Sequence, residues 1–299
     1  MSRVRRILYN QRVAPYVFVL PFVLTFLIFF VYPLISTVRM SFQDILPGQV
    51  TYVGLNNYQR LLGDRVFRTA VSNSLWYTVG TCALLIPIPL VLACLISSRN
   101  MVASSFYRAL LFLPIVTSVV VAGTIFRLMF GEVGGSLMNS MRALFGLAPI
   151  KWLKVRETSF FALILLACWR WTGVNMIYYL SGLKSISPDL YESAQIDGAN
   201  GWQQFRYISV PLLKPTVIYV LTISIYGGLA MFTESYMLWA GNNSPKSIGL
   251  TIVGYLYRMG WERNRMGYAS AVGLALLAIA MIINLIQLRI TGVLGKERD

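Results

Sequence analysis

Six runs of apolar residues constrain the fold of this 299-residue chain more than any other feature, because each is long enough to cross a membrane. A spanning α-helix needs about 20 mostly apolar residues, and a helix satisfies its own backbone where lipid offers no hydrogen-bond partner. The sequence therefore predicts an all-α polytopic membrane protein, with a single transmembrane domain over residues 1–299. The six predicted spans are residues 14–38, 73–96, 109–130, 159–182, 216–240 and 267–290.

The composition agrees with a membrane protein and argues against other classes. Hydrophobic residues make up 57% of the chain, which is too apolar for a soluble domain of this length. The net charge of +15 does not indicate nucleic-acid binding, because Lys and Arg are scattered over loops and span ends, beside membrane lipids. The chain has no His, and Cys82, Cys94 and Cys168 all fall inside predicted spans. We therefore expect no metal site and no enzymatic centre.

The basic residues leave the orientation in the membrane almost undecided. With both termini in the cytoplasm, Lys and Arg divide nearly equally between the two sides. The basic cluster within residues 3–12 precedes the first span, and early charges favour a cytoplasmic N-terminus.

The polar segment between the fourth and fifth spans, residues 187–211, has the signals of two short helices. Ser187, Pro188 and Asp189 form a helix start, with a hydroxyl cap, a preset φ and an acid near the positive end of the helix dipole. Gly198 is placed to end this helix in a left-handed conformation. A second helix is predicted from Trp202 to Ile208, after which Pro211 should mark the return to the membrane.

Two interpretations of this segment follow from the residues. Small side chains at Ser193, Ala194, Gly198 and Ala199 would permit close approach by another protein, as in a compact knob. An amphipathic elbow that lies on the lipid surface is the alternative.

A family resemblance favours the knob. Glu192-Ser193-Ala194, Gly198, Ile208 and Val210-Pro211 closely resemble, in order and spacing, the EAA loop of ATP-binding-cassette importer permeases. The chain is similar to the carbohydrate-uptake branch, the maltose-permease-like proteins. Residues 15–42, 52–67, 112–130 and 266–276 also resemble segments at the same places in those permeases. Three departures are a Ser at 193, a Val at 210, and Gly241-Asn242-Asn243-Ser244-Pro245 where the family often has Gly-Gly-Pro.

The resemblance implies that the loop is cytoplasmic, fits a cleft of an ATPase and transmits its movement to the spans. Both termini would then be cytoplasmic, in the inner membrane of a bacterium or archaeon. The implied partners are a second, homologous permease, two ATPase subunits and an extracytoplasmic solute-binding protein. The sequence contains no G-x-x-x-x-G-K-[ST] phosphate loop, so ATP and Mg²⁺ should bind the partner ATPase, with no cofactor on this chain. The expected ATPase-coupling residues are Tyr191, Glu192, Ser193, Ala194, Asp197, Gly198, Ala199 and Trp202.

The resemblance also implies that the solute is a sugar, such as an oligosaccharide, a glycoside or a sugar derivative. A non-sugar solute such as glycerol phosphate is the alternative, and a secondary transporter is a further one. Sugar sites combine an aromatic platform with hydrogen-bonding groups, and relatives of the maltose permease place a Trp and a Ser at the positions of Trp169 and Ser224. The other path candidates are Asn175 and Tyr178 in the fourth span, with Thr117 and Ser118 in the third. Helix packing would account equally for each of these residues.

The clearest ionisable residues inside predicted spans are Arg170 and Glu234. Charges within a membrane are costly unless they pair or face a polar cavity. We therefore expect an ion pair between the fourth and fifth spans, with a structural rather than a substrate-binding role.

Overall fold

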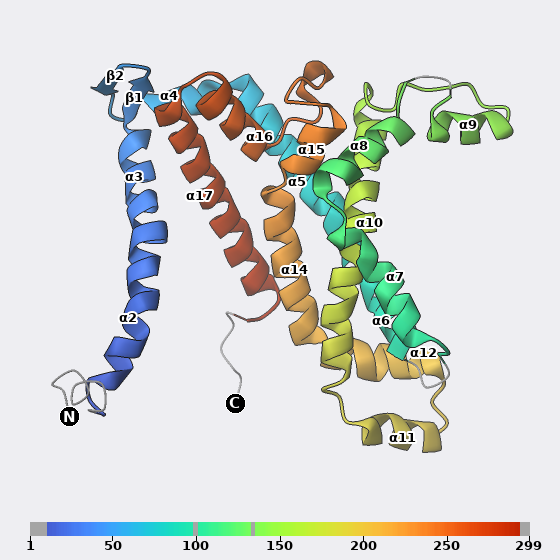
Figure 1. Cartoon of the computed structure of the whole chain (residues 1–299). Coiled ribbons are helices and arrows are strands. Elements are labelled where there is room, and N and C mark those ends of the chain that lie inside the picture. The colour runs from blue at the N-terminus through green and yellow to red at the C-terminus, as the bar shows by residue number, and fades with distance from the viewer. Residues whose placement is uncertain (1–10, 98–100, 133–134, 294–299) are drawn as a thin grey trace, which may run out of the picture. The chain divides into compact units, whose positions relative to one another are not determined.

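The computed structural model describes residues 11–97, 101–132 and 135–293, and most of them are helical (Figure 1). The chain divides into two compact units. The first comprises Met1–Gly63 and Leu256–Ala275, and the second comprises Asp64–Tyr255 and Leu276–Asp299. The helical character confirms the predicted fold class, while the single domain over residues 1–299 stays a prediction.

The first unit begins with one continuous helix, Ala14–Ser41, built from α2 (Ala14–Phe26), a π-helical turn (Leu27–Val31) and α3 (Tyr32–Ser41). A short antiparallel hairpin of β1 (Gln43–Leu46) and β2 (Gln49–Tyr52) follows, which the sequence does not predict. Asn57, in α4 (Asn56–Gly63), fixes this corner by donating from Nδ2 to the carbonyls of Ser41 and Gln43, each at 2.9 Å. A π-helical turn (Arg258–Glu262) and the start of α17 (Met266–Ile290) complete the unit.

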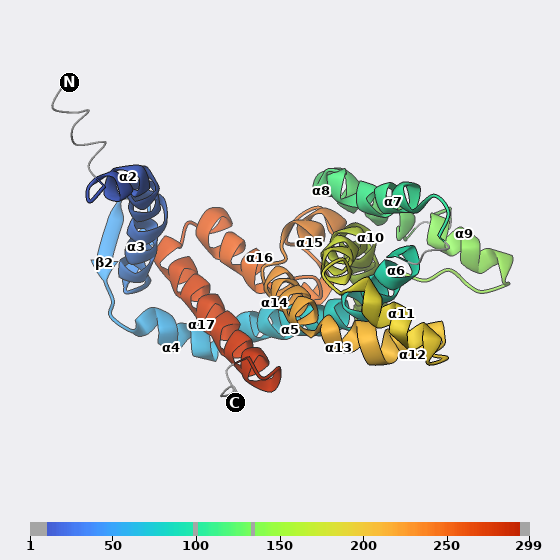
Figure 2. The same ribbon diagram turned by 90° about the horizontal axis from the view of Figure 1, so that it is seen from below.

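The second unit contains the other helices and the end of α17. Its central helix is α10 (Arg156–Leu183), which contacts α5, α6, α7, α8, α14 and α15, as the view in Figure 2 shows. The bounds of the other helices in this unit are α5 Arg65–Leu85, α6 Pro87–Ser97, α7 Ser104–Val116, α8 Val119–Met129, α9 Leu137–Leu144, α11 Pro188–Ile196, α12 Gly201–Gln204, α13 Val210–Leu212, α14 Lys214–Leu229, α15 Thr233–Leu238 and α16 Ile252–Tyr257, of which the last ends in the first unit.

Four of the six predicted spans are helices long and apolar enough to cross a membrane by themselves. They are Ala14–Ser41, Arg65–Ser97, Arg156–Leu183 and Met266–Ile290. The third span is broken: α7 and α8 meet at an angle of 92°, with Thr117 and Ser118 extended between them. Hydroxyl and β-branched residues crowd this point, and they favour helices weakly.

The predicted fifth span, residues 216–240, is wrong in its second part. The helix α14 ends at Leu229, residues 230–232 leave it, and α15 is a separate short helix. Gly227 and Gly228 lie just before the break, where their conformational freedom weakens the helix. Gly228 also has no room for a side chain, because a Cβ there would lie 2.6 Å from Thr78 Oγ1.

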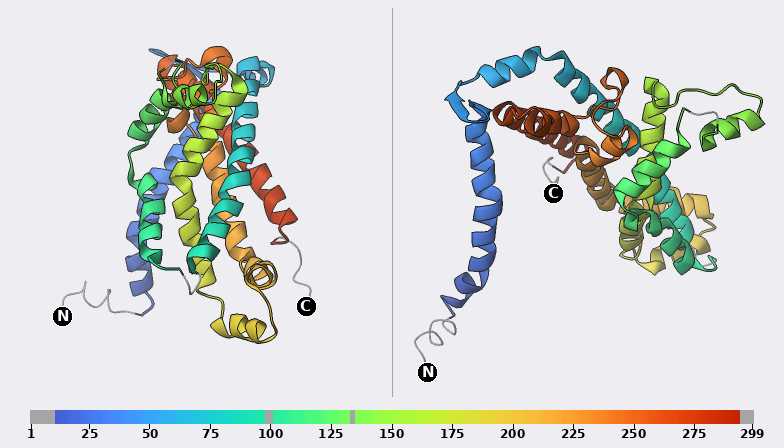
Figure 3. Two further views of the ribbon diagram at one scale, coloured as in Figure 1. Left: turned by 90° about the vertical axis from the view of Figure 1, so that its right-hand side faces the viewer. Right: turned by 45° about the horizontal axis from the view of Figure 1, so that its top comes forward.

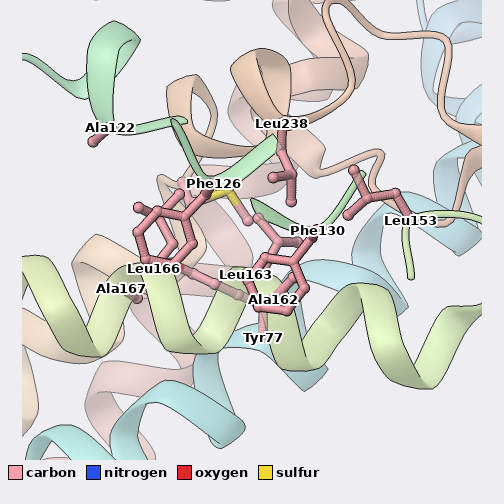
Figure 4. Close-up of a cluster of buried hydrophobic side chains, with 11 residues drawn as sticks. Tyr77, Ala122, Phe126, Phe130, Leu153, Ala162, Leu163, Leu166, Ala167 and Leu238 are labelled. Carbon is pink, nitrogen blue, oxygen red and sulfur yellow. The ribbon is translucent and has the colours of Figure 1, made fainter. Parts of the chain in front are cut away.

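A buried apolar cluster joins α8, α10 and α15 at the N-terminal end of α10 (Figure 4). Phe126 lies in α8 and Phe130 is the C-cap of that helix. Their rings stack with centroids 6.1 Å apart, and both pack in one cluster with Leu163 and Leu166. Leu238 of α15 and Leu153 close the cluster. A second cluster, around Met176, Tyr179 and Leu213, holds the opposite end of α10.

Asn175 of α10 bonds to the junction between α5 and α6. Pro89 has no N–H, so the helical partner of the Leu85 carbonyl is missing. Asn175 is buried and donates from Nδ2 to this carbonyl at 3.0 Å. The hydrogen bond therefore repairs a broken helix inside the membrane, where an unsatisfied carbonyl would be costly.

We predict that Asn175→Leu lowers the stability of the protein by about 1–3 kcal/mol, because the Leu85 carbonyl loses its partner. The loss should shrink in a Pro89→Ala background, where residue 89 regains an N–H. Thermal unfolding of the purified chain in detergent measures both effects.

Thr81→Val is the matched control, because the buried Thr81 hydroxyl only bonds back to its own helix, to the carbonyls of Tyr77 and Thr78. An equal loss from Asn175→Leu in the wild-type and Pro89→Ala backgrounds would show that the two residues are not coupled.

Candidate functional site

The segment 187–211 folds as its first part predicts. Ser187 caps α11 by accepting a hydrogen bond from the Asp189 amide at 3.3 Å. Gly198 ends the helix with a φ of +82°, which a residue with a side chain rarely adopts. The amides of Gly198 and Ala199 donate to the carbonyls of Gln195 and Ala194, at 3.0 and 2.8 Å. This paired closure fixes the direction in which the chain leaves the helix.

The second helix of the segment is longer than predicted. Asn200 and Gln203 form a reciprocal capping box at its start, with hydrogen bonds of 2.7 and 2.9 Å. The helix continues past Ile208 through a π-helical turn, Phe205–Ser209, and through Pro211 to Leu212. The prediction that Pro211 marks the return to the membrane is therefore wrong. The wider π turn tolerates a proline that has no N–H, and the chain turns by 67° at Leu213 instead.

The two helices of the segment lie across the C-terminal end of α10 and the start of α14, beyond the ends of the bundle helices (Figure 3). Tyr191 and Ser209 tie them together through their hydroxyls at 2.9 Å. Gln204 donates to the Ala199 carbonyl at 3.1 Å and braces the turn. The segment is thus a built element with its own internal hydrogen bonds.

The side chains expected to touch a partner divide into two groups. Glu192, Ser193, Asp197, Gly198 and Trp202 are exposed. Tyr191, Ala194 and Ala199 are partly buried, and Tyr191 packs on the second apolar cluster.

The sequence reasoning missed Ile196, which is 87% exposed at the last position of α11. Its place between Glu192 and Gly198 within the motif could have indicated a contact residue. Trp202 of the same segment is a second large apolar side chain with high exposure, at 69%. We call Glu192, Ile196, Asp197, Gly198 and Trp202 the coupling surface.

The expected intramembrane ion pair is present. Arg170 Nη1 lies 2.8 Å from Glu234 Oε1, and the two side chains are only 9% and 14% exposed. Glu234 stands in α15 rather than at the end of a continuous fifth span, so the pair pins this separate short helix onto α10.

The residues predicted to line the solute path do not form one cluster. Asn175 lies 3.4 Å from Ser224 Oγ, so the structure brings these two together, but Asn175 is occupied by the Leu85 carbonyl. Tyr178 meets Tyr219 edge to face, with ring centroids 5.2 Å apart. Trp169 is 40% exposed and its ring lies 5.7 Å from that of Phe126. Thr117 and Ser118 form the break between α7 and α8.

A family comparison decides what kind of protein carries these features. Residues 4–292 match the family described as the binding-protein-dependent transport system inner membrane component. The chain belongs to this family. It is therefore a multi-pass permease of the inner membrane.

The relatives of the permease agree over nearly its whole length. It is 49% identical, over 96% of its own length and 91% of the relative's, to the arabinooligosaccharides transport system permease protein AraP of Bacillus subtilis. It is 29% identical to the lactose transport system permease protein LacF of Rhizobium radiobacter, over 91% of this chain and 92% of that protein.

Solved structures show the same fold. The permease superposes with a TM-score of 0.80 on a chain of a bacterial ABC transporter involved in the import of the acidic polysaccharide alginate, at 25% identity and covering 99% and 100% of the two chains. A chain of the bacterial alginate transporter in complex with an alginate pentasaccharide-bound periplasmic protein gives a TM-score of 0.84 at 26% identity, with 99% of each chain covered.

We predict that Arg170→Met or Glu234→Gln destabilises the permease by about 3–5 kcal/mol, because either change leaves a buried charge without its partner. Exchanging the charges, with Arg170→Glu and Glu234→Arg together, should restore part of the loss. Thermal unfolding and the amount of chain inserted into membranes measure the effect.

The control is the exposed pair Lys154–Glu132, whose charged atoms lie 2.6 Å apart with side chains 49% and 36% exposed. Neutralising it should cost at most about 1 kcal/mol. Additive losses in the Arg170 and Glu234 cycle, with no coupling energy, would contradict an energetically important pair.

Proposed function

We propose that the permease forms half of the path by which an ATP-driven, binding-protein-dependent importer takes up an oligosaccharide that contains arabinose. The 49% identity to an arabinooligosaccharide permease across 96% of the chain carries this proposal. A sugar solute is also consistent with the alginate pentasaccharide in the complex of the structural neighbour.

The proposal places the coupling surface in the cytoplasm, against an ATPase, and both termini on the same side. The support is an exposed surface on a segment that is fixed by its own caps and hydrogen bonds. A rigid knob can pass on a movement, whereas a flexible loop would absorb it. ATP and Mg²⁺ then bind on the ATPase partners, two per importer, while a second, homologous permease supplies the other half of the path.

Transport follows from a two-state equilibrium of the assembled importer. ATP binding favours one arrangement of the permease pair and nucleotide release favours the other. The solute-binding protein delivers the sugar at the end of the bundle opposite the coupling surface. The segments that connect the spans there are the surfaces available to it.

Uptake of labelled arabinooligosaccharide by the reconstituted importer tests the proposed solute. Unlabelled arabinooligosaccharide should compete, whereas lactose and glycerol phosphate in equal excess should not. Competition by lactose alone would identify a different sugar, and competition by glycerol phosphate would overturn the assignment to sugars. Uptake driven by an ion gradient in the absence of ATP would place the permease among secondary transporters.

We predict that Gly198→Asp lowers uptake at least tenfold while the chain still inserts into the membrane. The substitution adds bulk and charge on the coupling surface, where a partner wall must approach closely. Uptake and the amount of permease in the membrane fraction are measured together.

Gly292→Asp is the matched control. Gly292 ends α17 as Gly198 ends α11, with a φ of +82° and the same pair of closing hydrogen bonds from residues 292 and 293. Neither glycine has an atom within 4 Å of an added Cβ, so backbone strain is alike at the two sites. Equal loss of uptake from both substitutions would attribute the Gly198→Asp effect to strain rather than to contact.

A further inference from the structure

The helix α9 has an apolar side that no other described residue covers. Leu144 and Phe145 are 85% and 79% exposed, and Leu137 and Met141 are about half exposed. Steps of four and three residues place Leu137, Met141 and Leu144 on one side of the helix, and Phe145 follows on the same side. The helix is therefore amphipathic, with its apolar side turned outward.

The opposite side of α9 is held by the chain itself. Asn139 is buried, accepts hydrogen bonds from the Ile150 amide at 3.1 Å and from Trp152 Nε1 at 2.9 Å, and donates to the Ile150 carbonyl at 3.2 Å. The polar side thus faces residues 150–152, which belong to the segment that leads from α9 back to α10 and that we call the returning segment. This arrangement fixes which side of the helix remains open.

The returning segment is anchored in the apolar cluster shown in Figure 4, to which it contributes Leu153. The ring of its Trp152 lies 5.4 Å from that of Phe130, edge to face. Trp239 of the loop after α15 donates from Nε1 to the Leu153 carbonyl at 2.9 Å. The helix α9 is therefore tied to the ends of α8 and α10, at the end of the bundle opposite the coupling surface (Figure 1).

The charges and neighbours of α9 indicate what covers its apolar side. Between Glu132 and Glu157 the chain carries Arg142, Lys151, Lys154 and Arg156, of which Lys154 pairs with Glu132 at 2.6 Å. Exposed apolar residues continue from α9 to the ends of the adjoining helices, at Leu128 and Val155. An apolar helix side beside cationic residues, at the end of membrane spans, suits the boundary between acyl chains and anionic headgroups.

We infer that α9 is an interfacial membrane anchor, with Leu137, Met141, Leu144 and Phe145 in the acyl boundary and with Arg142 and Lys151 at anionic headgroups. The anchor sets the depth of α8 and of the start of α10 in the membrane. This inference goes beyond the proposed transport function and does not depend on the solute.

Fluorescent labels on adjacent residues test the inference in the assembled importer. Leu144→Cys and Ala143→Cys are labelled with an environment-sensitive nitrobenzoxadiazole dye in nanodiscs of phosphatidylethanolamine and phosphatidylglycerol. Ala143 is exposed on the polar side of the helix, so it is the matched control. Labelling of the unsubstituted chain, which contains only Cys82, Cys94 and Cys168, is subtracted.

The label at residue 144 should be quenched several-fold more strongly than the label at 143 by lipids brominated near the headgroup end of the acyl chain. Replacing phosphatidylglycerol by phosphatidylcholine should reduce that quenching. Equal, weak quenching at both positions would overturn the inference. So would a label at residue 144 that becomes shielded only when the solute-binding protein is added, because the apolar side would then be a protein-docking surface. Retained ATP hydrolysis by the labelled importer shows that the assembly is intact.

Discussion

The arrangement of the second unit depends on hydrogen bonds from side chains to backbone groups that broken helices leave without partners. Lipid supplies no donors or acceptors, so each break must be satisfied within the protein. Asn175 satisfies the Leu85 carbonyl at the junction of α5 and α6. Asn73 donates to the carbonyls of Ser247 and Leu250, and Thr251 donates to the Met231 carbonyl after α14 ends. These bonds are what allow short helices such as α15 and α16 to exist at the end of a membrane bundle.

The two ends of the second unit differ in how their side chains are used. From the N-terminal end of α10 to its middle, side chains bond or pack with one another through the Arg170–Glu234 pair, the Trp239–Leu153 bond and the aromatic cluster. At the C-terminal end of α10, the segment 187–211 is fixed by its own hydrogen bonds but presents the exposed side chains of the coupling surface. The helix α10 contacts α5, α6, α7, α8, α14 and α15, so it links these two ends of the unit.

The sequence predicted the elements whose causes are local. The fourth span was expected over residues 159–182 and extends from 156 to 183, and the Ser187 cap and Gly198 stop are where their side chains require them. The breaks in the third and fifth spans were not predicted, because the residues on both sides stay apolar and the repairing groups lie far away in the chain. Asn175 shows the same limit. Its role as a sugar contact stays a prediction, whereas its hydrogen bond to the Leu85 carbonyl joins residues 90 apart in the chain and could not be foreseen. Ile196 was not predicted as a contact residue, because the motif is defined by small and acidic residues.

The central claim is that the coupling surface contacts an ATPase in the cytoplasm, and photo-crosslinking from Ile196 tests it most directly. A benzophenone amino acid replaces Ile196 in one variant and the exposed Asn243, in the loop after α15, in a second, and both are irradiated in intact membranes. The account predicts that residue 196 crosslinks to a chain whose peptides contain a phosphate-binding loop, and that residue 243 does not. A crosslink from residue 196 only to lipid or to a solute-binding protein, or ATPase capture from residue 243, would contradict it.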